Sequence, residues 1–347
     1  MAGDSSTLFA MRIEPADFDE TNADPETLAL NEQLERLTRR LPDPVEVGIG
    51  PVRETQKQGR GLFGPAVYSD LAENRTIRGP AGELGIRVFI ADRVDGIYLH
   101  FHGGGWALGS ASDRDSRLEA IARNSGVAVV SVDYRLAPEH PYPAASDDAE
   151  AAALWVVEAG ADVFGTDRIV TGGESAGAHL AATAMLRLRD RHGFTGFAGA
   201  VFVYGFFDLA LTASARNWGE RPLVLNTDTC RWFAETYAAG ADVADPDVSP
   251  LYADLTGLPP TLIVIGTQDP LLDDSLIMGA RLVTAGSDAE LHVATGAAHG
   301  FTSSSIPASD RAKAAIQDWI QRCVAEARTD RSPVVSTESR APVAGSL

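Results

Sequence analysis

Basic residues are scarce in this chain of 347 residues. It holds 29 lysines and arginines against 48 aspartates and glutamates, for a formal net charge of −19, and only Lys57 and Lys313 are lysines. A surface with this excess of negative charge repels phosphate backbones and anionic lipids. The composition therefore predicts that the protein has no nucleic-acid partner and does not attach to acidic membranes.

Cysteine is also rare, and long apolar runs are missing. Cys230 and Cys323 match no metal-binding or redox spacing, so we expect two ordinary thiols in a reducing compartment. No stretch approaches the roughly 18 uncharged apolar residues of a spanning helix. Residues 1–20 lack the basic and apolar regions of a secretory signal. These features predict a cytoplasmic protein without a membrane span.

From about residue 86 onward, short apolar runs rich in β-branched residues alternate with segments of helix length. This alternation predicts a mainly parallel sheet with helices on both sides. The predicted strands are Gly96–Phe101, Val127–Val132, Arg168–Thr171, Ala198–Val203, Thr261–Ile265 and Ala289–Val293. The predicted helices are Ser112–Ser125, Ala144–Ala159, Ala176–Arg191, Asp274–Ala285 and Ala308–Ala327.

Three segments fall outside this alternation. The N-terminal segment holds a predicted helix, Pro25–Leu41, with Asp24 as its capping residue and leucines at helical spacing. The interval between Val203 and Thr261 is longer than a crossover needs, which predicts an insertion that forms part of a lid. The last residues are rich in Ser, Pro and Val and are expected to be disordered. The predicted organisation is an N-terminal arm at 1–45, a first core part at 46–206, the insertion at 207–252, a second core part at 253–329 and a tail at 330–347.

A serine with a glycine two places on either side joins a predicted strand to a predicted helix. Gly173-Glu174-Ser175-Ala176-Gly177 fits the pattern G-x-S-x-G, the nucleophile elbow. In such a tight turn a Cβ at either glycine position would clash, and the serine hydroxyl lies at the carboxyl edge of the sheet, at a helix N-terminus. The context predicts that Ser175 is a nucleophile.

A serine nucleophile needs a base and an acid that orients the base. Among the seven histidines, His299 follows the last predicted strand in a loop at the carboxyl edge and is the best candidate. Asp269 follows the preceding strand, and the chain order Ser175, Asp269, His299 is the one expected on this kind of sheet. Asp273 and Asp274 compete with Asp269 for the acid, and their other interpretation is capping of the next helix.

The consecutive glycines in His102-Gly103-Gly104-Gly105 follow the first predicted strand. Backbone without Cβ atoms can approach a substrate closely and direct its amides at a developing negative charge. The amides of Gly103, Gly104 and Ala176 are therefore predicted to form an oxyanion hole. His100 and His102 share one face of the strand and could resemble a metal pair, but no third ligand is apparent, so no metal site is predicted.

Taken together, these motifs resemble those of the hormone-sensitive-lipase-like family of α/β-hydrolases. The resemblance covers roughly residues 65–325 and rests on His102–Trp106, Asp133–Glu139, Pro141–Ala145, Gly173–Gly177, Asp269–Leu271 and His299–Phe301. It implies an α/β-hydrolase fold, with a mostly parallel eight-stranded sheet flanked by helices and a helical cap made from the arm and the insertion. It also implies a homodimer through the last strand and helix. The apolar stripe of that helix, Ile316, Ile320, Cys323 and Ala327, would serve equally as core.

Some positions depart from the family pattern. Glu174 stands where the family often has Asp or Thr, and it is interpreted either as a hydrogen-bonding group behind the site or as a solvated charge. Glu174 and several aromatic residues are expected to line or border the substrate pocket. The aromatic candidates are Trp106, Tyr204, Phe206, Phe207, Trp218, Phe233 and Phe301.

The sequence therefore predicts a serine carboxylesterase that hydrolyses short-chain esters of small molecules through an acyl-enzyme, with no cofactor. Two alternatives stay open. The same site could cleave amides, as an amidase or arylamide deacetylase does. The same scaffold could also bind a small ligand without catalysis, although such proteins tend to lose the histidine that is present here as His299.

Overall fold

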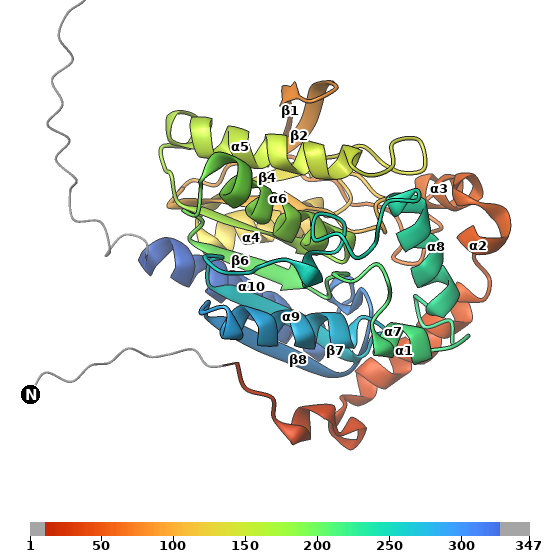
Figure 1. Cartoon of the computed structure of the whole chain (residues 1–347). Helices are drawn as coiled ribbons and strands as arrows, with labels where there is room; N and C mark the ends of the chain where they lie inside the picture. The colour runs from red at the N-terminus through yellow and green to blue at the C-terminus, as the bar shows by residue number, and fades with distance from the viewer. Residues whose placement is uncertain (1–10, 327–347) are drawn as a thin grey trace, which may run out of the picture.

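The computed structural model describes residues 11–326. The first ten residues of the predicted arm and the predicted tail, 330–347, lie outside this range. A single twisted sheet forms the middle layer, with helices on both sides (Figure 1). Helices α1, α2, α3, α7 and α8 gather at one end of the molecule in Figure 1.

The described residues form an eight-stranded sheet in the order β1-β2-β4-β3-β5-β6-β7-β8. Strands β3 to β8 are parallel, and β2 pairs antiparallel with both β1 and β4. The strands are β1 Ala72–Gly79, β2 Gly82–Phe89, β3 Gly96–Phe101, β4 Val127–Asp133, β5 Ile169–Glu174, β6 Gly199–Val203, β7 Thr261–Gln268 and β8 Ala289–Ala298. The predicted fold class is confirmed, and all six predicted strands are present.

The β1–β2 hairpin was not located from the sequence. Glu73, Arg78 and Glu83 are exposed on it, and only Ile77 of β1 is buried. An edge hairpin covered on one face lacks the continuous apolar run that identified the inner strands.

Two apolar layers pack against the sheet. Side chains from α5, α6 and α9 pack on one face, and side chains from α4 and α10 pack on the other. These helices are α4 Asp115–Ser125, α5 Ala144–Phe164, α6 Ala176–His192, α9 Leu272–Thr284 and α10 Pro307–Glu326. The stripe of Ile316, Ile320 and Cys323 on α10 faces the sheet, so within the described chain it serves as core.

The described part of the arm holds two short 3-10 helices and α1, and two further α-helices, α2 and α3, follow at and beyond its predicted end at residue 45. The elements are η1 Pro15–Phe18, η2 Glu20–Asn22, α1 Pro25–Thr38, α2 Pro44–Val47 and α3 Ile49–Lys57. The predicted side-chain cap at Asp24 is wrong, because Asp24 makes no capping hydrogen bond and instead pairs with Arg311 on α10. Helix α1 ends at Thr38, before the predicted Leu41.

The arm covers part of the edge strand β8. Thr295 Oγ1 donates to the carbonyl of Asp17 at 2.8 Å, and Asn31 Nδ2 donates to the carbonyl of Gly296 at 2.7 Å. A dimer through the last strand, which remains a prediction, would therefore use the amino-terminal half of β8.

The insertion between β6 and β7 carries α7 Ala213–Asn217, α8 Thr227–Ala238 and η3 Pro250–Tyr252. It meets the arm in a small apolar cluster in which Leu34 of α1 packs with Leu223 and Ala298. An ion pair between Arg221 and Glu35 lies at the same contact, with Nε and Oε1 2.6 Å apart. Because Ala298 directly precedes His299, arm and insertion meet beside the predicted catalytic base.

No helix within residues 11–326 is long and apolar enough to cross a membrane. Several charged side chains are buried in the described residues, and Arg187 is one of them. The guanidinium of Arg187 on α6 pairs with Asp147 at 2.9 Å, Glu150 at 3.2 Å and Asp247 at 2.6 Å, and thereby ties α6 to α5 and to the insertion.

Replacing Arg187 with methionine should lower the free energy of unfolding by about 3 kcal/mol, because three carboxylates lose their common partner in a partly buried place. Arg36→Met, which breaks the exposed pair with Glu32, is the control and should change it by less than about 0.5 kcal/mol. Urea denaturation of both variants measures the difference. Equal midpoints would contradict a stabilising role for Arg187.

Candidate active site

The turn between β5 and α6 lifts Ser175 out of the sheet. Ser175 has φ 55° and ψ −121°, a conformation that costs free energy in a residue with a side chain. A Cβ at Gly173 would lie 2.7 Å from the carbonyl carbon of Gly177, and a Cβ at either glycine would overlap the carbonyl oxygen of Phe101 on β3. Both glycines are therefore needed for the turn to approach its own helix and the neighbouring strand.

The structure brings Ser175, His299 and Asp269 into one hydrogen-bonded line. The Ser175 hydroxyl lies 3.0 Å from His299 Nε2, and His299 Nδ1 donates to Asp269 Oδ2 at 2.8 Å. Ser175 and His299 are 9% and 7% exposed, and Asp269 is 1% exposed. The bond to Asp269 holds the proton of the imidazole on Nδ1, so Nε2 is free to accept the serine proton.

The two competing carboxylates turn away from His299. Asp274 is fully buried and accepts hydrogen bonds from the amides of Phe207 and Asp208 and from the hydroxyl of Thr212, at 2.6–2.9 Å. Asp273 accepts from the amide of Ser214 at 2.8 Å. Burial raises the pKa of Asp274 to about 7. Both residues thus anchor the insertion to the first turn of α9, which follows Asp269, whereas the predicted alternatives were the acid role and helix capping.

The glycine loop after β3 lies beside the nucleophile. A Cβ at Gly103 would lie 3.5 Å from Ser175 Cβ and 2.9 Å from the carbonyl oxygen of Glu174. Gly104 has φ 121°, and its carbonyl accepts from the amides of Ala107 and Leu108 in a tight turn. Helix α6 begins at Ala176, whose amide belongs to the first turn and needs no partner within the helix. The three predicted oxyanion donors thus come from the two segments that meet at Ser175.

His102 and Tyr134 fix the start of this loop. Their rings stack at 4.1 Å, and the Tyr134 hydroxyl donates to the carbonyl of His102 at 2.7 Å. Burial lowers the pKa of His102, which keeps its ring neutral. Within the described residues no group of three or more His, Cys, Asp and Glu could hold a metal ion. His102 therefore has a structural place at the base of the loop.

An arginine of α3, just after the arm, fixes the other end of the loop, and it was not predicted from the sequence. Arg53 on α3 donates to the carbonyls of Ala107 at 2.9 Å and Ala137 at 2.7 Å, and it forms a two-point ion pair with Glu139. Nothing in the local sequence marks Arg53, because its partners lie more than fifty residues away along the chain.

The predicted pocket residues occupy different surroundings. Trp106 is fully buried, stacked on Tyr237 at 4.5 Å and in edge contact with His179 at 5.0 Å. Phe233 of α8 fills the place that a Cβ of Gly105 would take, so it adjoins the glycine loop. The other predicted pocket residues lie as follows: Tyr204 against His299 at 4.7 Å, Phe301 behind Tyr204, Phe206 against Trp106, Phe207 against Phe202, and Trp218, partly exposed, under Arg221.

Glu174 is 3% exposed, so its interpretation as a solvated charge is wrong. Its carboxylate pairs with His100 Nε2 at 2.9 Å and with a guanidinium nitrogen of Arg117 at 3.0 Å. Burial alone would raise the pKa of Glu174, but His100 and Arg117 outweigh burial and hold it well below its usual range. The carboxylate next to the nucleophile is therefore ionised and points behind the site.

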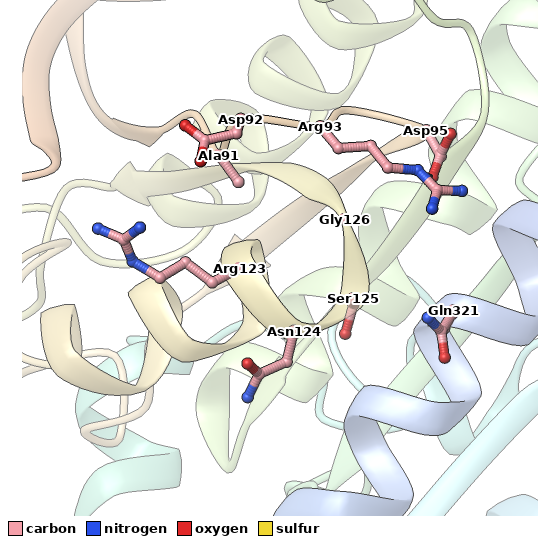
Figure 2. A pocket seen from close by; sticks show the side chains of 9 residues that line it. All are labelled: Ala91, Asp92, Arg93, Asp95, Arg123, Asn124, Ser125, Gly126 and Gln321. Carbon is pink, nitrogen blue, oxygen red and sulfur yellow. Dashed lines mark ion pairs between the residues drawn. The ribbon is translucent and has the colours of Figure 1, made fainter.

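A cavity of about 240 Å³ lies at the opposite edge of the sheet, where β3 and β4 begin (Figure 2). Its lining is Ala91, Asp92, Arg93, Asp95, Arg123, Asn124, Ser125, Gly126 and Gln321. None of the predicted site residues reaches it.

A mostly parallel sheet with a serine elbow, followed along the chain by an acid and a histidine that meet it, defines the class of α/β-hydrolases. A family model described as an α/β-hydrolase fold matches residues 98–303. The carboxylic ester hydrolase LipN of Mycobacterium tuberculosis is 36% identical over 69% of this chain and 66% of its own length.

Two solved esterase structures extend the likeness. An esterase from Pyrobaculum calidifontis is 32% identical, with a TM-score of 0.77 over 86% of this chain and 98% of its own. An esterase described as belonging to the bacterial hormone-sensitive lipase family is 29% identical, with a TM-score of 0.73 over 87% of this chain and 99% of its own. The chain belongs to the hormone-sensitive-lipase-like family of carboxylesterases, as its motifs predicted.

Asp269→Asn should lower kcat by about 10⁴, because an amide stabilises the imidazole tautomer with its proton on the wrong nitrogen. Asp274→Asn should lower it by no more than about tenfold, since the amide oxygen can still accept from the backbone of the insertion. Steady-state kinetics on a p-nitrophenyl ester compare the two. An equal loss in both variants would show that Asp269 has no special role.

Proposed function

We propose that the protein is a serine carboxylesterase that hydrolyses short-chain esters through an acyl-enzyme on Ser175. The observation that carries the proposal is the hydrogen-bonded line from Ser175 through His299 to Asp269, placed at the start of α6 and beside the glycine loop. The family likeness to named esterases supports the ester as the substrate class.

The geometry supports a two-step reaction. His299 Nε2 accepts the proton of Ser175 as the oxygen attacks the ester carbonyl, and the amides of Gly103, Gly104 and Ala176 stabilise the oxyanion. The protonated imidazole, held by Asp269, then donates its proton to the departing alcohol. A water molecule, deprotonated by the same imidazole, attacks the acyl-enzyme, and the acid leaves with Ser175 restored.

Ser175→Ala should lower kcat on p-nitrophenyl butyrate by at least about 10⁴, because covalent catalysis is lost, while the thermal midpoint stays close to that of the wild type. Thr183→Ala, a buried hydroxyl two turns further along α6, is the matched control and should keep its activity. Undiminished turnover by Ser175→Ala would refute the assignment.

Two further assays define the substrate. A series of p-nitrophenyl esters from acetate to palmitate should show the highest kcat/KM among the short chains and a steep fall beyond them. An ester and its matching anilide, assayed in parallel, separate the esterase from an amidase that uses the same three residues. Faster hydrolysis of the anilide would favour the amidase.

The arm and the insertion are proposed to form a cap over Ser175. They pack together through Leu34 and Leu223, and the ring of Phe233 on α8 packs against Gly105 of the glycine loop. Arg53 on α3, the helix that follows the arm, additionally binds that loop through the carbonyl of Ala107. These contacts support a cap that excludes water and limits the length of the acyl chain.

Deleting residues 1–45 should leave the sheet folded but change the preferred acyl length and lower kcat/KM by about tenfold or more, because apolar surface over the site becomes exposed. Circular dichroism checks the fold, and the ester series gives the profile. The exposed apolar surface should also increase aggregation. An unchanged rate and profile in a folded truncation would place the arm's function elsewhere, for example at a subunit interface.

A further inference from the structure

A buried group of charged and polar side chains lies behind the nucleophile and takes no part in the proposed reaction. Its centre is the carboxylate of Glu174, which contacts His100 on β3 and Arg117 on α4. His100 Nδ1 in turn lies within hydrogen-bond distance of the hydroxyl oxygen of Ser131, at 3.0 Å. Three elements of the core thus converge on the residue that precedes Ser175.

A contribution to folding stability does not explain the buried ion pair between Glu174 and Arg117. The side chains of Glu174 and Arg117 are 4% and 12% exposed, so both charges have lost most of their hydration. Apolar side chains of similar size are often as stabilising as a buried ion pair, or more so. What a buried ion pair does provide is a fixed geometry, because leaving either charge unpaired is costly.

The network reaches the elbow through the backbone of Glu174. The carbonyl oxygen of Glu174 lies 2.9 Å from the position of a Cβ at Gly103, so this peptide forms the contact between the elbow and the glycine loop. Anchoring the Glu174 side chain on α4 and β3 therefore restrains the peptide that carries the nucleophile.

The network reaches the histidine by a second route. Arg117 donates to Thr302 Oγ1 at 2.9 Å, and Thr302 Oγ1 lies 2.6 Å from the hydroxyl of Tyr204. Thr302 belongs to the 3-10 turn η4, Phe301–Ser303, which is separated from His299 by Gly300 alone. The ring of Tyr204 packs against the imidazole of His299 with centroids 4.7 Å apart.

We propose that Glu174, Arg117, Thr302 and Tyr204 form a positioning network that sets the distance and orientation between the Ser175 hydroxyl and the His299 imidazole. The inference rests on the proposed serine hydrolase function and deepens it. In this proposal they are positioning residues, which act through Ser175 and His299. Arg117 is the link between the two halves, because it contacts both Glu174 and Thr302.

The charges of the network should have a measurable effect on the pH profile of the enzyme. His299 is faced by Asp269, Ser175 and the ring of Tyr204, and Glu174 is faced by His100, Arg117 and, at longer range, Arg114. Burial raises the pKa of the nearby phenol Tyr204, so it stays neutral. With Glu174 and Arg117 both ionised, their effects on the imidazolium oppose each other.

When one of the two charges is removed, the electrostatic effect of the other on the imidazolium is no longer compensated. Glu174→Gln leaves the positive charge of Arg117, which disfavours the imidazolium and should move the acid limb of the pH profile of kcat/KM to lower pH by about half a unit. Arg117→Gln leaves the negative charge of Glu174 and should move the limb to higher pH by about as much. The double variant should return toward the wild-type midpoint.

The experiment measures kcat, KM and pH profiles of these three variants on p-nitrophenyl butyrate. Each single variant should lose about 10- to 100-fold in kcat with KM changed by less than about threefold, because misplacing the base affects the reacting step most. Asp115→Asn is the control. Asp115 lies on α4, as Arg117 does, and forms a buried ion pair with Arg87 on β2; losing this pair should lower the thermal midpoint without changing kcat or the pH profile.

A loss of kcat no greater than in Asp115→Asn, or shifts of the acid limb in the same direction in both single variants, would overturn the proposal. Should a charge variant fail to fold, Tyr204→Phe removes only the hydroxyl that meets Thr302 and should still lower kcat about threefold or more, an effect of losing one hydrogen bond. Wild-type kcat in folded Tyr204→Phe would likewise overturn it. Failure of the serine mechanism itself is distinguishable, because Ser175→Ala would then keep its activity.

Discussion

The close approach of the turn at Ser175 to strand β3 is the constraint on which the rest of the site depends. Gly173 and Gly177 both face the carbonyl oxygen of Phe101, and neither has room for a Cβ. Since Phe101 directly precedes His102 and Gly103, the same contact that bends the chain at Ser175 also places the glycine loop beside it. The strained backbone of Ser175 is held by this packing, as is common where a reactive group must be exposed.

Around this contact, the surrounding elements hold the site from several directions. Arg53 of α3 holds the glycine loop, and Asp274 holds the insertion to the first turn of α9, just after Asp269. Glu174 with Arg117 joins the elbow to the turn after His299. Each contact joins segments that are distant in the sequence. Electrostatic stabilisation of an oxyanion depends on donors that are already in place before the reaction, and such contacts are how a fold keeps them in place.

The candidate residues of the site itself could be identified from the sequence, whereas the residues that hold them in place could not. Gly173–Gly177 and the glycine loop can be recognised because their backbone conformation requires glycine. The inner strands can be recognised because both of their faces are apolar. Arg53 and Arg117 each look like any solvated arginine, since their roles depend on carbonyls and carboxylates brought close only by the fold. Asp24 has the sequence of a helix cap but pairs with Arg311 instead, because a tertiary partner outweighs a local preference.

The most direct test of the account is to observe the acyl-enzyme. When the protein is mixed with p-nitrophenyl acetate and quenched in acid within milliseconds, intact-mass spectrometry should show one added acetyl group, and peptide mapping should locate it on Ser175. The adduct should form before steady state and be absent from Ser175→Ala. An acetyl group on another residue, or steady hydrolysis without an adduct when deacylation limits the rate, would contradict a site organised around the turn at Ser175.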